Sequence, residues 1–513
     1  MRKKALTTIV SAVFACAMLI TALVPVTAIT GTDTADIYIS QVSDGTEISA
    51  YRVISVNVNE DAGVPESPMY KWDAEVARWL KANGYASYVL TGNHVSDTFK
   101  EANAGELTPF WHKLAKAIKT ESSYSFPVAE KATAIGEQVR ITEASMGQYL
   151  LTAKGGDKVY APTTATHVPA YNKATGKWTL SDTYINMKGE APTIDKTVAN
   201  TADKTVAIGD VITYKLTILA PSYPEDAVAT SFLVSDKLPA SLTYQKGTVK
   251  IYRDEQLTDQ VIAGGNYTVD ETATSSFTFR IDFSKSFIND ASNAGQKFYI
   301  TYNAKVTSAT PVYENTATIT YNNDPYDASS KKDITDTENV YSYTIEVQKV
   351  DRDKNPLTGA EFTLWSGEKQ LRFSGLNGDY MYDPTGTVDT LQVSSDGSFH
   401  VTGLDIGTYE LRETKAPDGF TIPTGAIKIV LVDTQPDGIL DDTSKVTTTG
   451  TYQLDGDSTI DKHILNFGVI NSAGFDLPVT GGSGTIAFTV FGLALMGGAA
   501  VMLLHSRKKA MKK

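Results

Sequence analysis

Alternating apolar and polar positions dominate the middle of the chain and predict β-strands. Residues 36–53 alternate in this way, as expected for a strand and hairpin. Short alternating segments with turn residues between them continue through two further regions, 192–337 and 341–472, at intervals typical of β-sandwiches. The polar segment Asp333–Asn339 between these regions is expected to be a turn. The pattern therefore predicts a mainly β protein of tandem immunoglobulin-like β-sandwich domains.

Two segments of the first region instead repeat apolar residues with helical spacing. We expect the first helix to end at Gly84 and the second to begin with Thr108 as N-cap and Pro109 at the first helical position. We therefore expect two helices inserted in the first domain. Their tryptophans are interpreted as core residues rather than a ligand platform. The apolar stripes consist of Trp72, Val76, Trp79 and Leu80 in the first helix, and Trp111, Leu114 and Ile118 in the second.

The two ends of the chain differ from its middle. A basic start, an apolar run and the small residues of 26–28 predict a signal peptide over 1–28. Near the other end, residues 486–504 carry no charge and precede a basic tail, which predicts a transmembrane helix with a cytoplasmic tail. After the signal peptide, we divide the chain into an N-terminal domain (29–190), two β-sandwiches (191–338 and 339–474) and a C-terminal signal (475–513).

Composition narrows the classes of function. The chain has 513 residues, 42% of them hydrophobic, so it can bury several cores. A formal net charge of −13 argues against a nucleic-acid partner. The only cysteine, Cys16, lies in the predicted signal peptide, so the exported protein is expected to hold no disulfide.

Conventional enzyme motifs are missing from the sequence. It contains no HExxH or Walker A motif, and its six histidines do not have ligand spacing. Acidic pairs at Asp351 and Asp353, and at Asp455 and Asp457, fit ordinary turns better than a metal site. We therefore predict no cofactor and no metal site.

A pentapeptide immediately precedes the C-terminal apolar segment. It consists of Leu477, Pro478, Val479, Thr480 and Gly481. Together with the apolar segment and the basic tail, it resembles the cell-wall sorting signal of Gram-positive surface proteins; the alternative is a plain linker to a membrane anchor. The resemblance implies that a sortase cleaves between Thr480 and Gly481 and holds Thr480 as a thioester, which an amine then resolves.

Six polar residues lie on apolar strand faces, where residues two apart share a face. Each of the two later regions has a lysine in its first strand, an acid midway and an asparagine in its last strand. A buried ammonium is costly unless it is paired or neutral. The six are Lys196, Asp236 and Asn315 in one region, and Lys349, Glu413 and Asn471 in the other.

Such a set can form a covalent bond. A neutral lysine amine is a nucleophile, and a protonated carboxylic acid can polarise an asparagine amide and pass a proton to the departing ammonia. The product is a Lys–Asn isopeptide bond. The alternative is a pair of buried salt bridges with hydrogen-bonded asparagines.

Longer motifs connect these regions to known domains. The region after residue 339 resembles the B-type domain of collagen-binding adhesins through Glu346–Asp351, Leu357–Phe362 and Gly407–Phe420. The preceding region resembles the A-type domain through Pro192–Lys196, Asp236 with Leu238-Pro239, and Asn315–Ala317. The whole chain resembles the major (shaft) pilins of Gram-positive sortase-assembled pili.

The resemblance implies specific bonds. Lys196 would join Asn315 with Asp236 as the catalytic acid, and Lys349 would join Asn471 with Glu413. Asn466 is the alternative partner of Lys349, although it lies on the other face of its strand. We expect no such bond in the first domain, because its early strand Ile37–Ser40 has no lysine. Each bond would close most of a domain, so that tension passes between the joined strands.

A shaft pilin also needs an acceptor lysine. Lys188 follows Thr183–Met187 near the end of the first domain, with Met187 where the family commonly has proline; Lys173 and Lys177 are alternatives. The implied partners are a pilin-specific and a housekeeping sortase, further copies of the chain, minor pilins and peptidoglycan. The expected location is the cell wall and surface after export and transient membrane retention. A non-polymerising wall-anchored adhesin and a minor pilin are the competing interpretations, and the residues do not identify a host matrix or glycan ligand.

Overall fold

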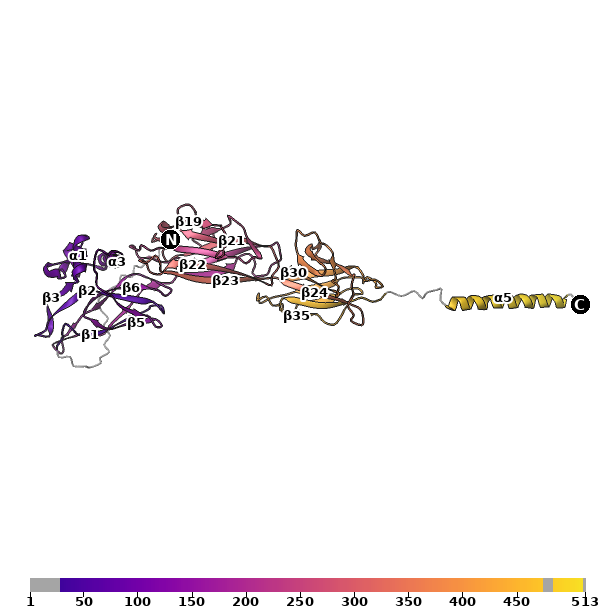
Figure 1. Ribbon diagram of the computed structural model, residues 1–513, viewed down its shortest axis with the longest axis horizontal. Coiled ribbons are helices and arrows are strands. Elements are labelled where there is room, and N and C mark those ends of the chain that lie inside the picture. The colour runs from indigo at the N-terminus through magenta and orange to yellow at the C-terminus, as the bar shows by residue number, and fades with distance from the viewer. Residues whose placement is uncertain (1–27, 474–482, 511–513) are drawn as a thin grey trace, which may run out of the picture. The chain divides into compact units, whose positions relative to one another are not determined.

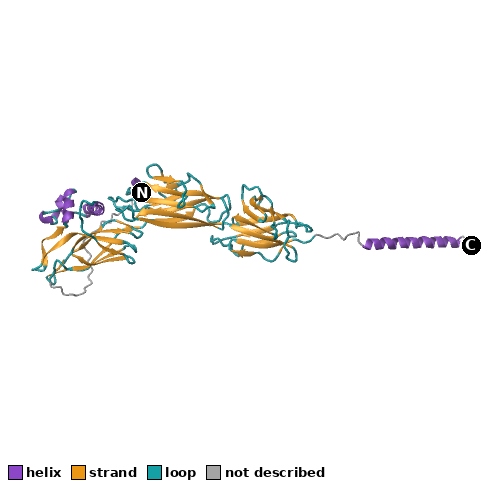
Figure 2. Cartoon of the chain, viewed as in Figure 1, coloured by secondary structure: helices purple, strands orange, loops and turns teal. Residues whose placement is uncertain are grey.

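The computed structural model describes residues 28–473 and 483–510, and strands are far more abundant than helices in this part of the chain (Figure 2). The prediction of a mainly β protein with immunoglobulin-type domains is confirmed. The chain divides into two compact units, one formed chiefly by residues up to 340 and the other by residues from 341 onward. Short segments at 205–209 and 308–311 belong to the second unit.

Residues 28–190 form two main sheets. Their cores contain the alternating apolar residues of the early strands, including Ile37, Ile39 and Ile48. One sheet has the order β11-β1-β5, and β1 and β11 pair in parallel. The other has the order β3-β2-β6-β8, with β4 also paired to β2. Short pairs β9–β10 and β7–β12 complete this part. The bounds are β1 Thr34–Ser40, β2 Glu47–Asn59, β3 Val64–Trp72, β4 Glu130–Thr133, β5 Gln138–Ser145, β6 Gly147–Lys154, β7 Val159–Tyr160, β8 Thr163–His167, β9 Ala170–Asn172, β10 Lys177–Thr179, β11 Thr183–Asn186 and β12 Gly189–Glu190.

Helices α1 (Ala74–Ala82) and α3 (Ala104–Thr120) belong to this part of the chain (Figure 1). A short α2 (Asp97–Lys100) and two 3-10 turns, η1 (Ala86–Tyr88) and η2 (Thr91–Asn93), lie between them. The predicted tryptophans are buried together with Val53 of β2 and Leu150 of β6, so the helices pack on that sheet. The tryptophans are therefore core residues, but Trp72 is the last residue of β3 and not part of the first helix as predicted, because Asp73 caps the start of α1.

The predicted start of the second helix is wrong. The helix begins at Ala104, with Asn103 as N-cap, and Pro109 lies inside it. The side chain of Asn103 accepts from the backbone N–H of Glu106, and the Glu106 carboxylate accepts from the backbone N–H of Asn103. This capping box satisfies two N–H groups at the helix end, which offsets the single hydrogen bond that proline cannot donate.

Residues 193–341 form a second pair of sheets within the first unit. One has the order β13-β14-β21-β17-β18, with β16 also on β21, and the other has the order β19-β20-β15-β22-β23. A short helix, α4 (Lys285–Ile288), precedes β21. The bounds are β13 Thr193–Val198, β14 Val211–Leu219, β15 Phe232–Lys237, β16 Leu242–Tyr244, β17 Lys250–Tyr252, β18 Gln260–Val261, β19 Tyr267–Asp270, β20 Phe279–Phe283, β21 Lys297–Val306, β22 Val312–Asn322 and β23 Lys331–Tyr341.

The segment Asp333–Asn339 is a strand and not the predicted turn. It lies within β23, which pairs with β22 at the edge of its sheet. Exposed positions such as Asp333 and Thr335 alternate along β23 with partly covered ones such as Ile334. An edge strand with one face in water can be largely polar, so its composition resembles that of a turn. Asn315 therefore lies in the penultimate strand of its region, and not in the last one as predicted.

The second unit contains two sheets around one core. One has the order β27-β28-β30-β24-β36-β34, with β35 also on β36, and the other has the order β26-β25-β31-β32-β33, with β29 on β25. The first strand, β24, and the last, β36, pair in parallel. The bounds are β24 Tyr343–Val350, β25 Glu361–Ser366, β26 Lys369–Gln370, β27 Phe373–Leu376, β28 Asp379–Tyr382, β29 Leu391–Gln392, β30 Ser398–Leu404, β31 Gly407–Lys415, β32 Ile427–Leu431, β33 Lys445–Thr448, β34 Gln453–Leu454, β35 Thr459–Asp461 and β36 Ile464–Ile470.

The C-terminal helix α5 spans Ser483–Ala510 and includes the predicted membrane segment 486–504. Among the described residues, however, we find no helix with both the length and the apolar character needed to cross a bilayer. Residues 1–27 of the predicted signal peptide, including Cys16, and the pentapeptide from Leu477 to Gly481 lie outside the described residues.

Candidate functional site

Parallel pairing of β24 and β36 brings Lys349 next to Asn471. Lys349 is opposite Val469 in the register, and Asn471 follows β36 directly. Lys349 Nζ donates to Asn471 Oδ1 at 2.5 Å and to the carbonyl oxygen of Val469 at 3.2 Å. Asn471 Nδ2 donates to Glu413 Oε1 at 2.7 Å. Three residues that are far apart in the sequence thus form one buried polar cluster.

Burial shifts both titratable groups of this cluster toward their neutral forms. It lowers the pKa of Lys349 to about 8, an effect that the nearby Glu413 partly opposes. Burial also raises the pKa of Glu413, opposed by Lys349 and by the hydrogen bond from Asn471. A neutral amine and a protonated acid are the forms that amide attack requires. Lys349 Nζ and Glu413 Oε2 are 3.8 Å apart, beyond hydrogen-bond distance, and Glu413 Oε2 has no hydrogen-bond partner among the described residues.

Asn466 does not lie at this cluster. It is opposite Glu346 in the β24–β36 register and is only half-buried. Lys349 and Asn466 occupy opposite faces, because side chains alternate along a strand. The structure therefore brings Asn471, and not the alternative Asn466, to Lys349.

The second predicted cluster lies between the two sheets of residues 193–341. Lys196 comes from β13, Asp236 from β15 and Asn315 from β22, and all three are buried. Lys196 Nζ contacts Asp236 Oδ2 in a buried ion pair. Asp236 Oδ1 and Asn315 Oδ1 are buried and have no hydrogen-bond partner among the described residues.

Tyr302 of β21 is a member of this cluster that the sequence reasoning missed. Its hydroxyl accepts from Lys196 Nζ at 2.6 Å and from Asn315 Nδ2 at 2.9 Å, and it donates to Asp236 Oδ2 at 2.6 Å. Phe298, Ile300 and Tyr302 alternate on one apolar face, so the tyrosine looks like an ordinary core residue. No spacing signal in the sequence separates it from its neighbours.

Burial has the same electrostatic effect here as in the other cluster. It lowers the pKa of Lys196 and raises the pKa of Asp236, and in each case the ion pair between them opposes the shift. Burial also raises the pKa of Tyr302 well above its ordinary value, so its hydroxyl stays protonated. The aromatic rings of Tyr214 and Tyr302, stacked with centroids 5.4 Å apart, line the lysine side chain and exclude water from it.

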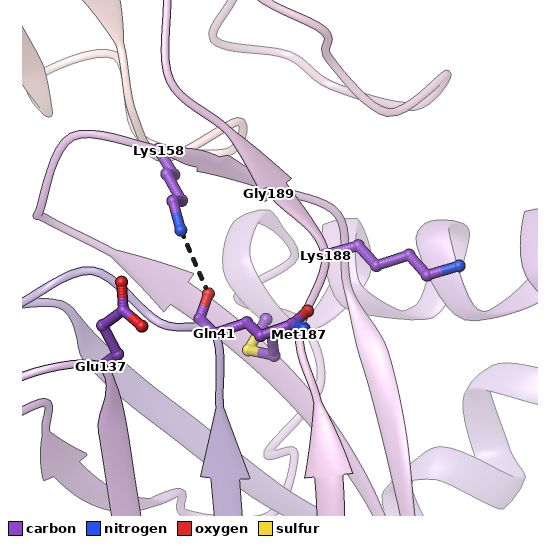
Figure 3. Close-up of a pocket in the computed structure, with 6 residues that line it drawn as sticks. All are labelled: Gln41, Glu137, Lys158, Met187, Lys188 and Gly189. Atoms are coloured by element: carbon purple, nitrogen blue, oxygen red, sulfur yellow. Dashed lines mark hydrogen bonds between the residues drawn. The ribbon is translucent and has the colours of Figure 1, made fainter.

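Lys188 lies in a different environment, in the short connection between β11 and β12. Its side chain is exposed and extends away from the neighbouring pocket residues (Figure 3). Met187 is fully buried, and its backbone N–H donates to the carbonyl oxygen of Ser40 at 3.1 Å. Because adjacent side chains in extended chain point in opposite directions, the buried Met187 directs Lys188 outward.

A pocket of about 280 Å³ lies beside this connection. Lys158 donates from its Nζ to the carbonyl oxygen of Gln41 at 3.4 Å at this pocket (Figure 3). The alternative lysines, Lys173 and Lys177, are also exposed but belong to the β9–β10 hairpin region. The pocket is lined by Gln41, Glu137, Lys158, Met187, Lys188 and Gly189.

Family models match three parts of the chain. A prealbumin-like fold domain matches residues 343–445, and the cell surface antigen I/II C2 terminal domain matches residues 192–332. The LPXTG cell wall anchor motif matches residues 470–510. The chain is also 24% identical over 567 residues to the trypsin-resistant surface T6 protein of Streptococcus pyogenes serotype M6, covering 94% of this chain and 97% of that protein.

Solved structures of pilins are similar as well. The full-length major pilin SpaD of Corynebacterium diphtheriae matches with a TM-score of 0.48 and 19% identity, over 87% of this chain and 99% of the other. The T6 backbone pilin of Streptococcus pyogenes matches with a TM-score of 0.55 and 18% identity, over 87% of this chain and 100% of the other. The chain has the fold of a backbone pilin. Its LPXTG anchor match and its surface relative indicate a protein anchored at the cell wall and displayed on the cell surface.

Proposed function

We propose that this backbone-pilin-like chain is the shaft subunit of a covalent pilus, joined through Thr480 of one copy to Lys188 of the next. The observation that carries the assignment of Lys188 is its exposed side chain, held outward by the buried Met187. An amine must project from the protein surface to reach a thioester on a separate enzyme. The amines of Lys196 and Lys349 are buried and cannot do so.

The reaction at Lys188 is an acyl transfer. Its amine attacks the thioester carbonyl of Thr480, the bond to the sortase sulfur breaks, and an amide forms between the two copies. The new copy presents its own Lys188, so the addition can repeat. A head-to-tail arrangement of this kind does not close on itself and produces a fibre.

We also propose that the two buried clusters form isopeptide bonds, Lys196–Asn315 with Asp236 and Lys349–Asn471 with Glu413. Lysine Nζ attacks the asparagine Cγ, the Cγ–Nδ2 bond breaks, and ammonia leaves with the proton that the amine gives up. The contacts of Asn471 with both Lys349 and Glu413 support this chemistry. Each bond forms once per chain, so the protein is structural and not a turnover enzyme.

The proposed partners follow from this assembly. A pilin-specific sortase would join copies of the chain, and a housekeeping sortase would transfer the finished fibre to peptidoglycan. Minor pilins would share the fibre, and a host matrix protein or glycan would be a ligand of the assembled surface.

Denaturing gels of wall extracts test the polymerisation, using cells that express the pilin-specific sortase and either the native chain or Lys188→Ala. We expect the native chain to give a high-mass ladder and Lys188→Ala to give only wall-bound monomer. Lys173→Ala and Lys177→Ala serve as matched controls and should keep the ladder. A ladder that persists in Lys188→Ala would move the acceptor to another lysine, and no ladder in any strain would favour a non-polymerising adhesin.

A further inference from the structure

The hydroxyl of Tyr302 contacts both nitrogens that must exchange a proton in the cluster of Lys196, Asp236 and Asn315. It accepts from Lys196 Nζ, the attacking atom, and from Asn315 Nδ2, the leaving atom. A phenolic oxygen has two lone pairs and one proton, so these two bonds and the one donated to Asp236 use its full capacity. The hydroxyl therefore bridges the attacking and the leaving nitrogen.

In the cluster of Lys349, Glu413 and Asn471, no tyrosine hydroxyl from the described part of the chain bridges the attacking and the leaving nitrogen. There Asn471 contacts Lys349 directly, and Glu413 itself accepts from the leaving nitrogen. The nearby Tyr452 hydroxyl accepts from the backbone N–H of Glu413 instead. Asp236 is one methylene shorter than Glu413, and Tyr302 occupies the position between the aspartate and the asparagine amide.

We propose that Tyr302 is a catalytic residue of Lys196–Asn315 bond formation, relaying the proton from Lys196 Nζ to Asn315 Nδ2. As the Nζ–Cγ bond forms, Nζ gives a proton to Tyr302 Oη, and the hydroxyl turns its own proton from Asp236 Oδ2 toward Nδ2 and transfers it there. The Cγ–Nδ2 bond then breaks, ammonia leaves, and the hydroxyl is regenerated. Asp236, in its protonated form, polarises the amide carbonyl. This assignment rests on the proposed isopeptide chemistry.

Pulse-chase synthesis of the full chain, followed by digestion and mass spectrometry of the linked peptides, tests the relay. In Tyr302→Phe we expect the Lys196–Asn315 link to form about tenfold more slowly or worse, since acid–base groups commonly contribute that much or more. The Lys349–Asn471 link, which lies in the other compact unit of the same molecule, should form at its native rate and serves as the internal standard. Tyr244→Phe is the matched control, because its ring also packs on Tyr302 while its hydroxyl donates to Glu271 outside the cluster.

A 3-fluorotyrosine at position 302 separates relay from positioning. It keeps the shape and the hydroxyl but changes the acidity of that hydroxyl, so a relay alters the linking rate and a purely structural role leaves it unchanged. An unaltered rate of Lys196–Asn315 linking in both Tyr302→Phe and the fluorinated chain would overturn the relay but leave the proposed isopeptide bond standing. If the native chain lacks the Lys196–Asn315 link, the proposed bond fails as well. If Tyr302→Phe also loses the Lys349–Asn471 link, the chain has misfolded as a whole, and the linking rate of the fluorinated chain is then the test of the relay.

Discussion

The Nζ of Lys349 lies 2.5 Å from Oδ1 of Asn471, although 122 positions separate the two residues in the sequence. The parallel pairing of the first and last strands of the second unit creates this contact. A bond between these residues would enclose nearly all of the domain, so the strands that enter and leave it would be joined directly.

Glu413→Gln should abolish the Lys349–Asn471 bond. Glutamine keeps the size of the side chain but cannot take up and return a proton. Without the bond the second unit should lose about 4–5 kcal/mol of unfolding free energy, by analogy with a disulfide closing a loop near 100 residues. Mass spectrometry should show one ammonia retained, and denaturant unfolding gives the stability.

Glu410→Gln is the control for this substitution, because Glu410 pairs with Arg412 at the surface. It should leave the bond intact. An intact bond in Glu413→Gln would contradict the role of the acid.

The unlinked variant Asn471→Ala should have an unusual pH profile. The pKa of Lys349 is lowered from 10.5 to about 8, so the unfolded state binds more protons between these values and stability rises with pH there. The gain is at most about 3 kcal/mol. The pKa of Glu413 is raised from 4.5, so stability falls as pH rises above that value.

Unfolding of the Asn471→Ala chain at a series of pH values should therefore show a minimum between the two ranges. Adding Lys349→Met should remove the rise between pH 8 and 10.5. A profile that only falls toward alkaline pH would argue against a lowered lysine pKa.

Met187→Ala should affect both stability and assembly. Met187 is fully buried in the first-domain core, so its truncation should cost about 2–5 kcal/mol. The backbone next to Lys188 would lose its anchor, and the high-mass ladder should weaken. Thermal unfolding and wall-extract gels measure the two effects.

Met187→Leu preserves the buried volume and should cost less than about 1.5 kcal/mol. A full ladder in a clearly destabilised Met187→Ala chain would show that the anchor is not needed to present Lys188.

Tyr326→Ala tests the packing of the first unit. Tyr326 follows β22 and is buried with the aromatic residues of α1 and α3. Its truncation should cost about 3 kcal/mol or more. Tyr171, which is 51% exposed, is the control, and Tyr171→Ala should change stability by only about 0.5 kcal/mol. Equal effects of the two substitutions in denaturant unfolding would contradict this packing.

The strand periodicity was enough to single out six polar residues as buried, whereas their specific pairing came from the family resemblance. Lys349 and Glu413 each stand out as polar residues on apolar faces, and alternation along a strand places them inside. Asn471 could be preferred over Asn466 for the same reason. The mainly β fold followed from the same alternation.

Other features gave no such signal. Tyr302 is a buried aromatic on an apolar face, so only its hydrogen bonds reveal its place in the cluster. The polar composition of β23 hides a strand because one face of an edge strand meets water. The start of α3 depends on reciprocal contacts between Asn103 and Glu106, which compete with the preference of Pro109 for a helix start.

The position of Asn315 before the end of its region has a mechanical consequence. Thr316 faces Thr337 and Thr320 faces Asp333, so β22 and β23 run antiparallel beyond the proposed Lys196–Asn315 bond. Tension between Asn315 and Tyr341 would separate β23 from β22, breaking the pairs between the two strands one after another. Because β22 stays paired with β15, the roughly 19 residues from the end of β22 to Tyr341 are released and would add about 65 Å of length. Single-molecule stretching should show this step, which would make each subunit a small extensible spring in an otherwise stiff fibre.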